Sequence, residues 1–80
     1  MKKYSVKHST TLFDTPTIPP NDCNQITNAG MGVGAGQILY GIPVSRKRMG
    51  FGMENFIHIA SPTHISGKEV LGQYVLANAV

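Results

Sequence analysis

The chain has 80 residues, with seven lysine or arginine side chains against four aspartate or glutamate side chains and a formal net charge of +3. A chain of this length forms at most one domain and buries only about 60–65% of the surface of its unfolded form, so its own core is marginal. Cys23 is the only cysteine, which excludes a disulfide within the monomer, and the histidines lack the paired spacings of a structural zinc site. By elimination, we expect association with copies of itself or with a larger partner to supply the missing stability.

The charge pattern also indicates a surface that is covered in an assembly. Charged residues make up only 14% of the chain, against roughly 25% in ordinary soluble domains, whereas 41% of the residues are apolar. Residues 1–50 carry six basic and two acidic side chains, a net charge of +4, and residues 51–80 carry a net charge of −1. This asymmetry favours head-to-tail contact between copies, although salt screens it.

No targeting or membrane segment is expected. The residues after Lys2 and Lys3 are too polar for the apolar core of a secretory signal, and no run of about 18 apolar residues could span a membrane. We therefore expect a protein of the cytoplasm, or of a particle assembled inside the cell, with no membrane partner.

Residues 1–29 are predicted to form an extended N-terminal arm with short strands in residues 4–13. Three of the five prolines fall between Thr15 and Asp22, where proline excludes a helix and removes ladder donors. A segment with few apolar anchors is ordered mainly by lying on another surface. A frayed terminus with one edge strand is the alternative. The anchors are Val6, Leu12, Phe13, Ile18 and Ile26.

A glycine stands at every second position from Gly30 to Gly36. If this run is extended, one face of the strand carries no side chain, so another strand, a subunit or an anionic ligand can approach the backbone closely. If it is not extended, it is a mobile loop. We predict an extended edge or inter-subunit strand, with an interaction site at the backbone of Gly30, Gly32, Gly34 and Gly36.

The same run fits the dinucleotide fingerprint G-x-G-x-x-[GA]. That fingerprint needs a strand before it, a helix after it and a further βαβ unit, and this sequence offers none of them. Nucleotide binding in this mode is therefore not expected.

Residues 30–80 are predicted to form a small, mainly β domain of short strands, barrel-like or sandwich-like. Pro43 places the later half of its strand at an edge or a bend. In residues 55–60, strict alternation places Phe56 and His58 on one face and Ile57 and Ile59 on the other. The predicted strands of the whole chain lie near residues 4–13, 37–44, 55–60 and 69–77.

The last segment, residues 69–77, is predicted to be either a strand or a short helix. Ser66 and Glu69 have the spacing of a capping box, and apolar residues follow at helical spacing. Against a helix, Gly67 and Lys68 are typical of a turn between two short strands, and valine and tyrosine favour strands.

Arg46, Lys47 and Arg48 form the one cluster of charge. If it meets nucleic acid, it would contact phosphates with a salt slope of roughly −3, while Tyr40 and Phe51 stack on bases. The alternative is a solvated β-turn whose charges protect a sheet edge against aggregation.

No set of residues points to catalysis or to a cofactor. Four carboxylates spread over 80 residues leave little for paired acid–base chemistry, and no nucleophile–base–acid pattern occurs. A metal site that joins His58 and His64 with His8 is less favoured than packed histidines. We therefore expect no enzyme, no cofactor and no metal.

These observations predict a non-enzymatic structural or assembly protein. It would be a small subunit of a larger complex, such as a virion decoration, tail or shell component of a phage, that associates through β-strand and glycine-rich surfaces. Two alternatives remain open: a small nucleic-acid-binding module with a basic turn and flanking aromatic residues, and a small inhibitor of a partner enzyme.

Overall fold

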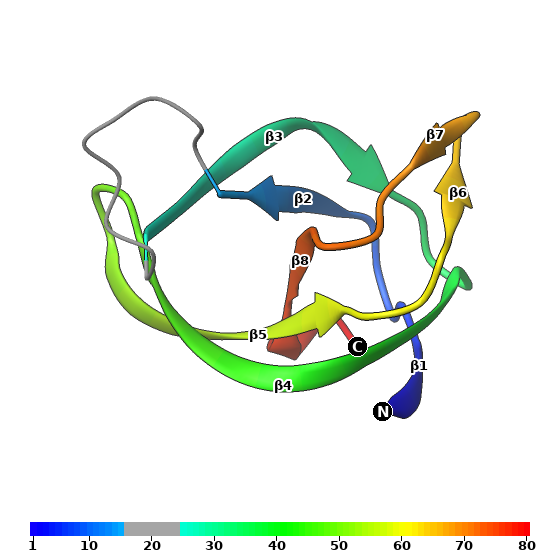
Figure 1. Ribbon diagram of the computed structural model, residues 1–80, viewed down its shortest axis with the longest axis horizontal. Helices are drawn as coiled ribbons and strands as arrows, with labels where there is room; N and C mark the ends of the chain where they lie inside the picture. Colours follow the sequence, from blue (N-terminus) through cyan, green and yellow to red (C-terminus); the bar gives the residue numbers. More distant parts are fainter. Residues whose placement is uncertain (16–24) are drawn as a thin grey trace.

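The computed structural model describes residues 1–15 and 25–80 (Figure 1). The predicted mainly β class is confirmed, and the described residues outside the strands form turns, loops and one short 3-10 helix. The elements are β1 (Lys2–Ser5), β2 (Thr10–Asp14), β3 (Gln25–Val33), β4 (Ile38–Arg48), β5 (Gly52–Ile59), β6 (His64–Ile65), β7 (Lys68–Glu69), β8 (Tyr74–Leu76) and η1 (Ala77–Ala79).

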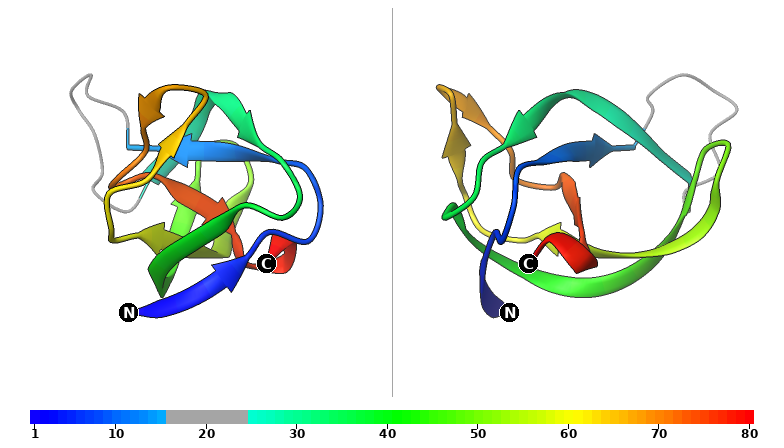
Figure 2. Two further views of the ribbon diagram at one scale, coloured as in Figure 1. Left: turned by 90° about the vertical axis from the view of Figure 1, so that its right-hand side faces the viewer. Right: turned by 180° about the vertical axis from the view of Figure 1, so that it is seen from behind.

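Six of the described strands form one strongly curled sheet. Antiparallel pairings run in the order β1–β4–β5–β8–β2–β3. The curl closes where the first residues of β3 pair in parallel with the last residues of β4, Gln25 with Lys47 and Ile26 with Arg48. The two further views show the ribbon bending round on itself (Figure 2). A sheet closed in this way is barrel-like and leaves few free edges.

Strand β4 is the longest strand and the partner of three others. It pairs with β1 through its first four residues, with β5 from Gly41 onward and with β3 through its last two. In an antiparallel pair, every second residue of a strand forms hydrogen bonds with the partner strand. Tyr40 is such a residue, because its carbonyl accepts from the Ala60 amide at 2.9 Å. Pro43 is three residues further along β4, so its nitrogen points away from β5. In the described sheet, neither β1 nor β3 pairs with β4 at Pro43, and the expected edge position is confirmed.

The core has two parts on opposite faces of β2, β5 and β8. Each of these strands carries one pair of adjacent buried residues that point to opposite faces, as Phe56 and Ile57 do on β5. One part, the aliphatic cluster, comprises Val6, Leu12, Val33, Leu39, Ile57, Ile59, Ile65, Val70, Val75 and Ala79. The other, the aromatic cluster, comprises Phe13, Ile26, Phe56 and Tyr74.

The N-terminal residues lie within the sheet rather than in a separate arm. β1 and β2 pair with β4, β3 and β8, and the expected boundary at residues 29 and 30 falls inside β3. The apolar anchors of this segment are few, but each described one is buried: Val6 and Leu12 in one core cluster, and Phe13 and Ile26 in the other. The predictions made on residues 16–24, including Ile18 and Cys23, lie outside the described residues.

The C-terminal segment forms a strand, β8, and then the single turn of η1. The capping-box alternative fails because Ser66, with φ +52°, and Gly67, with φ +77°, form the tight turn of the β6–β7 hairpin. Within residues 1–15 and 25–80, no helix is long and apolar enough to cross a membrane.

Candidate interaction site at the β4–β5 hairpin

The three basic residues of the predicted site belong to a strand and not to a turn. Arg46, Lys47 and Arg48 are the last residues of β4, and the turn follows them at residues 49–51. The prediction of a basic β-turn is therefore wrong, because pairing with β5 continues through Arg48 to Gly52. Side chains alternate along a strand, so Arg46 and Arg48 share one face and Lys47 lies on the other.

Arg48 is held in place by three groups. Its guanidinium lies 3.9 Å from the ring centre of Phe51 and 5.0 Å from that of Phe13, and Nη1 is 3.3 Å from Oε2 of Glu54. The planar guanidinium of Arg48 therefore covers the outer side of the aromatic cluster at Phe13. Arg48 therefore serves the fold, and its charge is already compensated.

Arg46 and Lys47 differ from Arg48. Arg46 lies with Cζ 6.0 Å from the ring centre of Tyr74, and its Nη1 donates to the carbonyl of Ser45 at 2.9 Å. Lys47 is exposed beside Met53, its partner across the hairpin. Neither forms an ion pair with a carboxylate of the described residues.

The two aromatic residues of the predicted site are separated. Phe51 lies in the hairpin turn and covers Arg48, whereas Tyr40 is six residues before Arg46, about 20 Å along the strand. The structure thus brings Phe51 to the basic residues and leaves Tyr40 at the other end of β4.

The hairpin turn and the first residues of β5 expose three large apolar side chains, and only one of them, Phe51, belongs to the site predicted from the sequence. Met49, Phe51 and Met53 are 46%, 70% and 64% exposed, and we call these three residues the apolar tip. The turn lies at one end of the longest axis of the molecule, opposite the β6–β7 hairpin (Figure 1). Large apolar residues alternating with Gly50 and Gly52 were the available signal, since a turn usually presents polar side chains.

The glycine run is divided between a strand and a turn. In β3, Ala29, Met31 and Val33 pack against the aliphatic cluster, while Gly30 and Gly32 face solvent. Gly30 has φ +79° where β3 bulges opposite β2, and its amide donates to Oδ1 of Asn28. The other two predicted positions, Gly34 and Gly36, lie in the exposed β3–β4 connection. The outer face of β3 at Gly30 and Gly32, which we call the bare glycine face, therefore carries no side chain.

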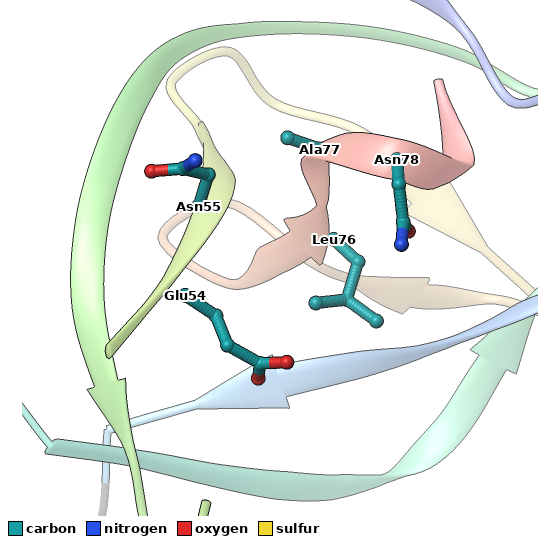
Figure 3. A pocket seen from close by; sticks show the side chains of 5 residues that line it. All are labelled: Glu54, Asn55, Leu76, Ala77 and Asn78. Carbon is teal, nitrogen blue, oxygen red and sulfur yellow. The ribbon is translucent and has the colours of Figure 1, made fainter. Parts of the chain in front are cut away.

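An open recess of about 420 Å³ lies where β8 turns away from β5 into η1 (Figure 3). Its lining offers amides and apolar groups, and its one carboxylate, that of Glu54, is paired with Arg48. Asn55 is engaged as well, because its Oδ1 accepts from Oγ of Ser45 at 2.9 Å. The lining residues are Glu54, Asn55, Leu76, Ala77 and Asn78.

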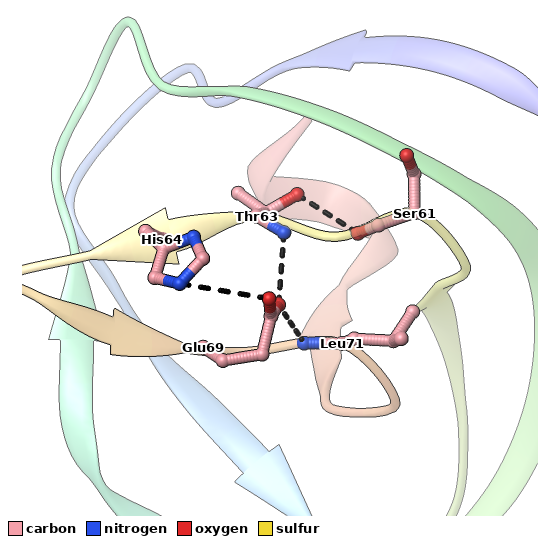
Figure 4. A network of polar contacts seen from close by, with 5 residues as sticks. All are labelled: Ser61, Thr63, His64, Glu69 and Leu71. Carbon is pink, nitrogen blue, oxygen red and sulfur yellow. Dashed lines mark hydrogen bonds and ion pairs between the residues drawn. The ribbon is translucent and has the colours of Figure 1, made fainter.

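A network of hydrogen bonds centred on Glu69 holds the two strands of the β6–β7 hairpin together (Figure 4). Oε1 of Glu69 accepts from the amides of Thr63 at 2.9 Å and Leu71 at 3.0 Å, and Oε2 lies 3.7 Å from Nε2 of His64. The hydrogen bond from Thr63 and then that from Leu71 lower the pKa of Glu69 below its ordinary value. The Glu69 carboxylate accepts hydrogen bonds from two backbone amides, as the side chain of a helix N-cap does, and so stabilises the β6–β7 hairpin.

The described histidines do not gather. His58 stacks on Tyr74 with ring centres 4.4 Å apart, and His64 contacts Glu69. Among residues 1–15 and 25–80, no three histidine, cysteine, aspartate or glutamate side chains lie close enough together to hold a metal ion.

Comparisons with protein-family models, with curated proteins and with solved structures found no match for this chain.

Proposed function

We propose that this protein is a non-catalytic assembly subunit that associates with copies of itself. The observation that carries the proposal is the apolar tip, in which three large hydrophobic side chains are exposed within five residues of one hairpin. Apolar groups gathered in this way are stabilised when a partner covers them, and each buried methylene group contributes about 0.8 kcal/mol.

The bare glycine face of β3 is the surface that this tip fits. Where a strand has no outward side chains, methionine and phenylalanine side chains can lie directly on the backbone of a neighbouring copy. The tip and the glycine face are different surfaces of one chain, so such a contact is head-to-tail and repeats into a ring or a filament. A subunit of a shell, tail or other particle would use a contact of this kind.

The polar groups support binding rather than chemistry. Among the described residues no charged side chain is buried, and the buried polar groups are Tyr74 and Oε1 of Gln73, which has no hydrogen-bond partner there. The carboxylates of Glu54 and Glu69 are both committed to contacts that hold the fold.

Light scattering after size-exclusion chromatography tests this proposal. At micromolar concentration we expect the wild-type protein to have a mass that is a multiple of the monomer mass and rises with concentration. Phe51→Ser and Met53→Ser are expected to shift the mass to that of the monomer, since each removes apolar area from the contact. Gly34→Gln, which adds a side chain beside the bare glycine face where no atom lies within 4 Å, is expected to weaken assembly as well.

Leu71→Ser is the matched control. Leu71 is 49% exposed and follows β7 by two residues, and the β6–β7 hairpin lies at the other end of the molecule from the tip (Figure 1). It is expected to leave the mass unchanged. A wild-type protein that stays monomeric throughout the micromolar range would contradict self-assembly.

A further inference from the structure

The first half of β4 presents a second exposed surface, separate from the apolar tip. Ile38, Tyr40 and Ile42 are 37%, 42% and 48% exposed. They stand at every second position, so all three point to the same side of the sheet. A monomeric domain rarely leaves such a row of large side chains uncovered.

Strand pairing places basic and aromatic side chains beside this row. Lys3 of β1 lies directly across from Tyr40, and His58 of β5 lies directly across from Ile42. The His58 ring is stacked on the Tyr74 ring at an interplanar angle of 11°, so Tyr74 covers one of its faces and fixes its orientation. Arg46 continues the same face of β4 and also lies over Tyr74. We call this surface, made of Lys3, Tyr40, Ile42, Arg46 and His58, the β4 platform.

The platform carries uncompensated positive charge. Glu54 is opposite Arg46 across the hairpin, but its carboxylate is paired with Arg48. Lys3 has no carboxylate partner among the described residues. A two-fold contact between two copies through this face would bring like charges together, which opposes self-association here and favours a polyanion.

We propose that the β4 platform binds single-stranded nucleic acid. Bases would stack on the Tyr40 ring and lie against Ile42 and His58, because every base has a flat face that an aromatic side chain can cover. Lys3 and Arg46, about 20 Å apart along β4, would contact phosphates at the two ends of this row. Lys47 lies on the opposite face of β4 and Arg48 is compensated, so neither takes part.

Single strands fit this surface better than a duplex does. The platform is the exposed face of a sheet, whereas a duplex is read by an element that enters one of its grooves. Stacking needs unpaired bases, and two phosphate contacts supply only a weak attraction to a duplex. Recognition through stacking and phosphates carries little sequence preference.

Fluorescence anisotropy with a labelled oligothymidylate at two sodium chloride concentrations tests the proposal. The wild-type protein is expected to bind with a slope of log affinity on log salt of about −1.4, the value for two phosphates of a single strand. Tyr40→Ala is expected to weaken binding by about ten-fold or more, and Tyr40→Phe is expected to bind as the wild type does. Lys3→Ala and Arg46→Ala are each expected to reduce the slope by about 0.7.

Lys68→Ala is the matched charge control for Lys3→Ala, since Lys68 is exposed on β7 away from the platform, and it should leave affinity and slope unchanged. The Phe51→Ser variant, which removes one side chain of the apolar tip, should still bind, and this separates the platform from the assembly contact. The proposal would be overturned if binding did not depend on salt or if Tyr40→Ala bound with unchanged affinity. Equally tight binding of labelled polyglutamate would also overturn it, because the platform would then be a site for acidic protein segments.

Discussion

The aliphatic and aromatic clusters lie on opposite faces of the same three strands and are built in different ways. Ten described residues form the aliphatic cluster, and the β1–β2 loop, the β6–β7 hairpin and η1 supply part of it. Only four form the aromatic cluster, which the start of β3 and the guanidinium of Arg48 cover. One cluster therefore depends on many segments approaching closely, and the other on a few large rings.

The largest effect is expected from the aromatic cluster. The Phe56 ring is fully buried and makes edge contacts with Phe13 at 5.4 Å and Tyr74 at 6.3 Å between ring centres. Phe56→Ala is expected to lower the free energy of unfolding by about 3–5 kcal/mol. This loss is a large fraction of the total stability of a domain of this size. Urea unfolding followed by circular dichroism measures it. Met53→Ala, exposed on the same strand, should change it by less than about 0.5 kcal/mol, and similar losses in both would contradict the comparison.

A smaller effect is expected where the aliphatic cluster depends on backbone approach. A Cβ at Gly41 would collide with the His58 carbonyl and lie 2.7 Å from Cγ2 of Ile57. Gly41→Ala is therefore expected to cost about 1–3 kcal/mol in urea unfolding, because β4 and β5 must move apart. At Gly34 a Cβ meets nothing within 4 Å and φ is not positive, so Gly34→Ala is the control that should unfold as the wild type does. Equal stability of the two variants would show that β4 and β5 separate freely.

The smallest effect is a pH dependence of the hairpin that covers the aliphatic cluster. Ile65 and Val70 enter this cluster from the segment that Glu69 ties together. The pKa of Glu69 is lowered from 4.5 in the fold, so its contribution to stability is complete above that value and is lost as the pH falls through the lowered pKa. The urea midpoint of Glu69→Gln is expected to fall less than that of the wild type between neutral pH and the pH range below 4.5. An identical fall in both proteins would mean that the carboxylate does not hold the hairpin.

The alternation in residues 55–60 shows how much of the fold could be predicted from the sequence. It correctly predicts a strand with Phe56 on one face and Ile57 on the other, but alternation usually implies one buried face and one exposed face. Here both residues are buried, because the sheet curls and other segments cover each face. Periodicity reports the local backbone and contains no information about such closure.

The basic residues make the same point for the candidate site. The sequence shows three adjacent cations, and nothing in their spacing separates Arg48 from Arg46. The separation comes from Phe51 in the turn, from Glu54 on β5 and from Phe13 on β2, far away in the chain. Ile42 and His58 of the β4 platform lie across from each other through the register of β4 and β5, which their positions in the chain do not reveal.

The sequence by itself determined the β class of the chain, the exclusion of a disulfide within the monomer, and the alternation that leaves the outer face of β3 without side chains at Gly30 and Gly32. Only the tertiary structure decided that the sheet closes, that residues 1–15 belong to it, and that one arginine is compensated while the apolar tip stays exposed. The physical reason is that side-chain alternation is a property of a few neighbouring residues. Burial and charge compensation are instead set by pairings between strands far apart in the chain.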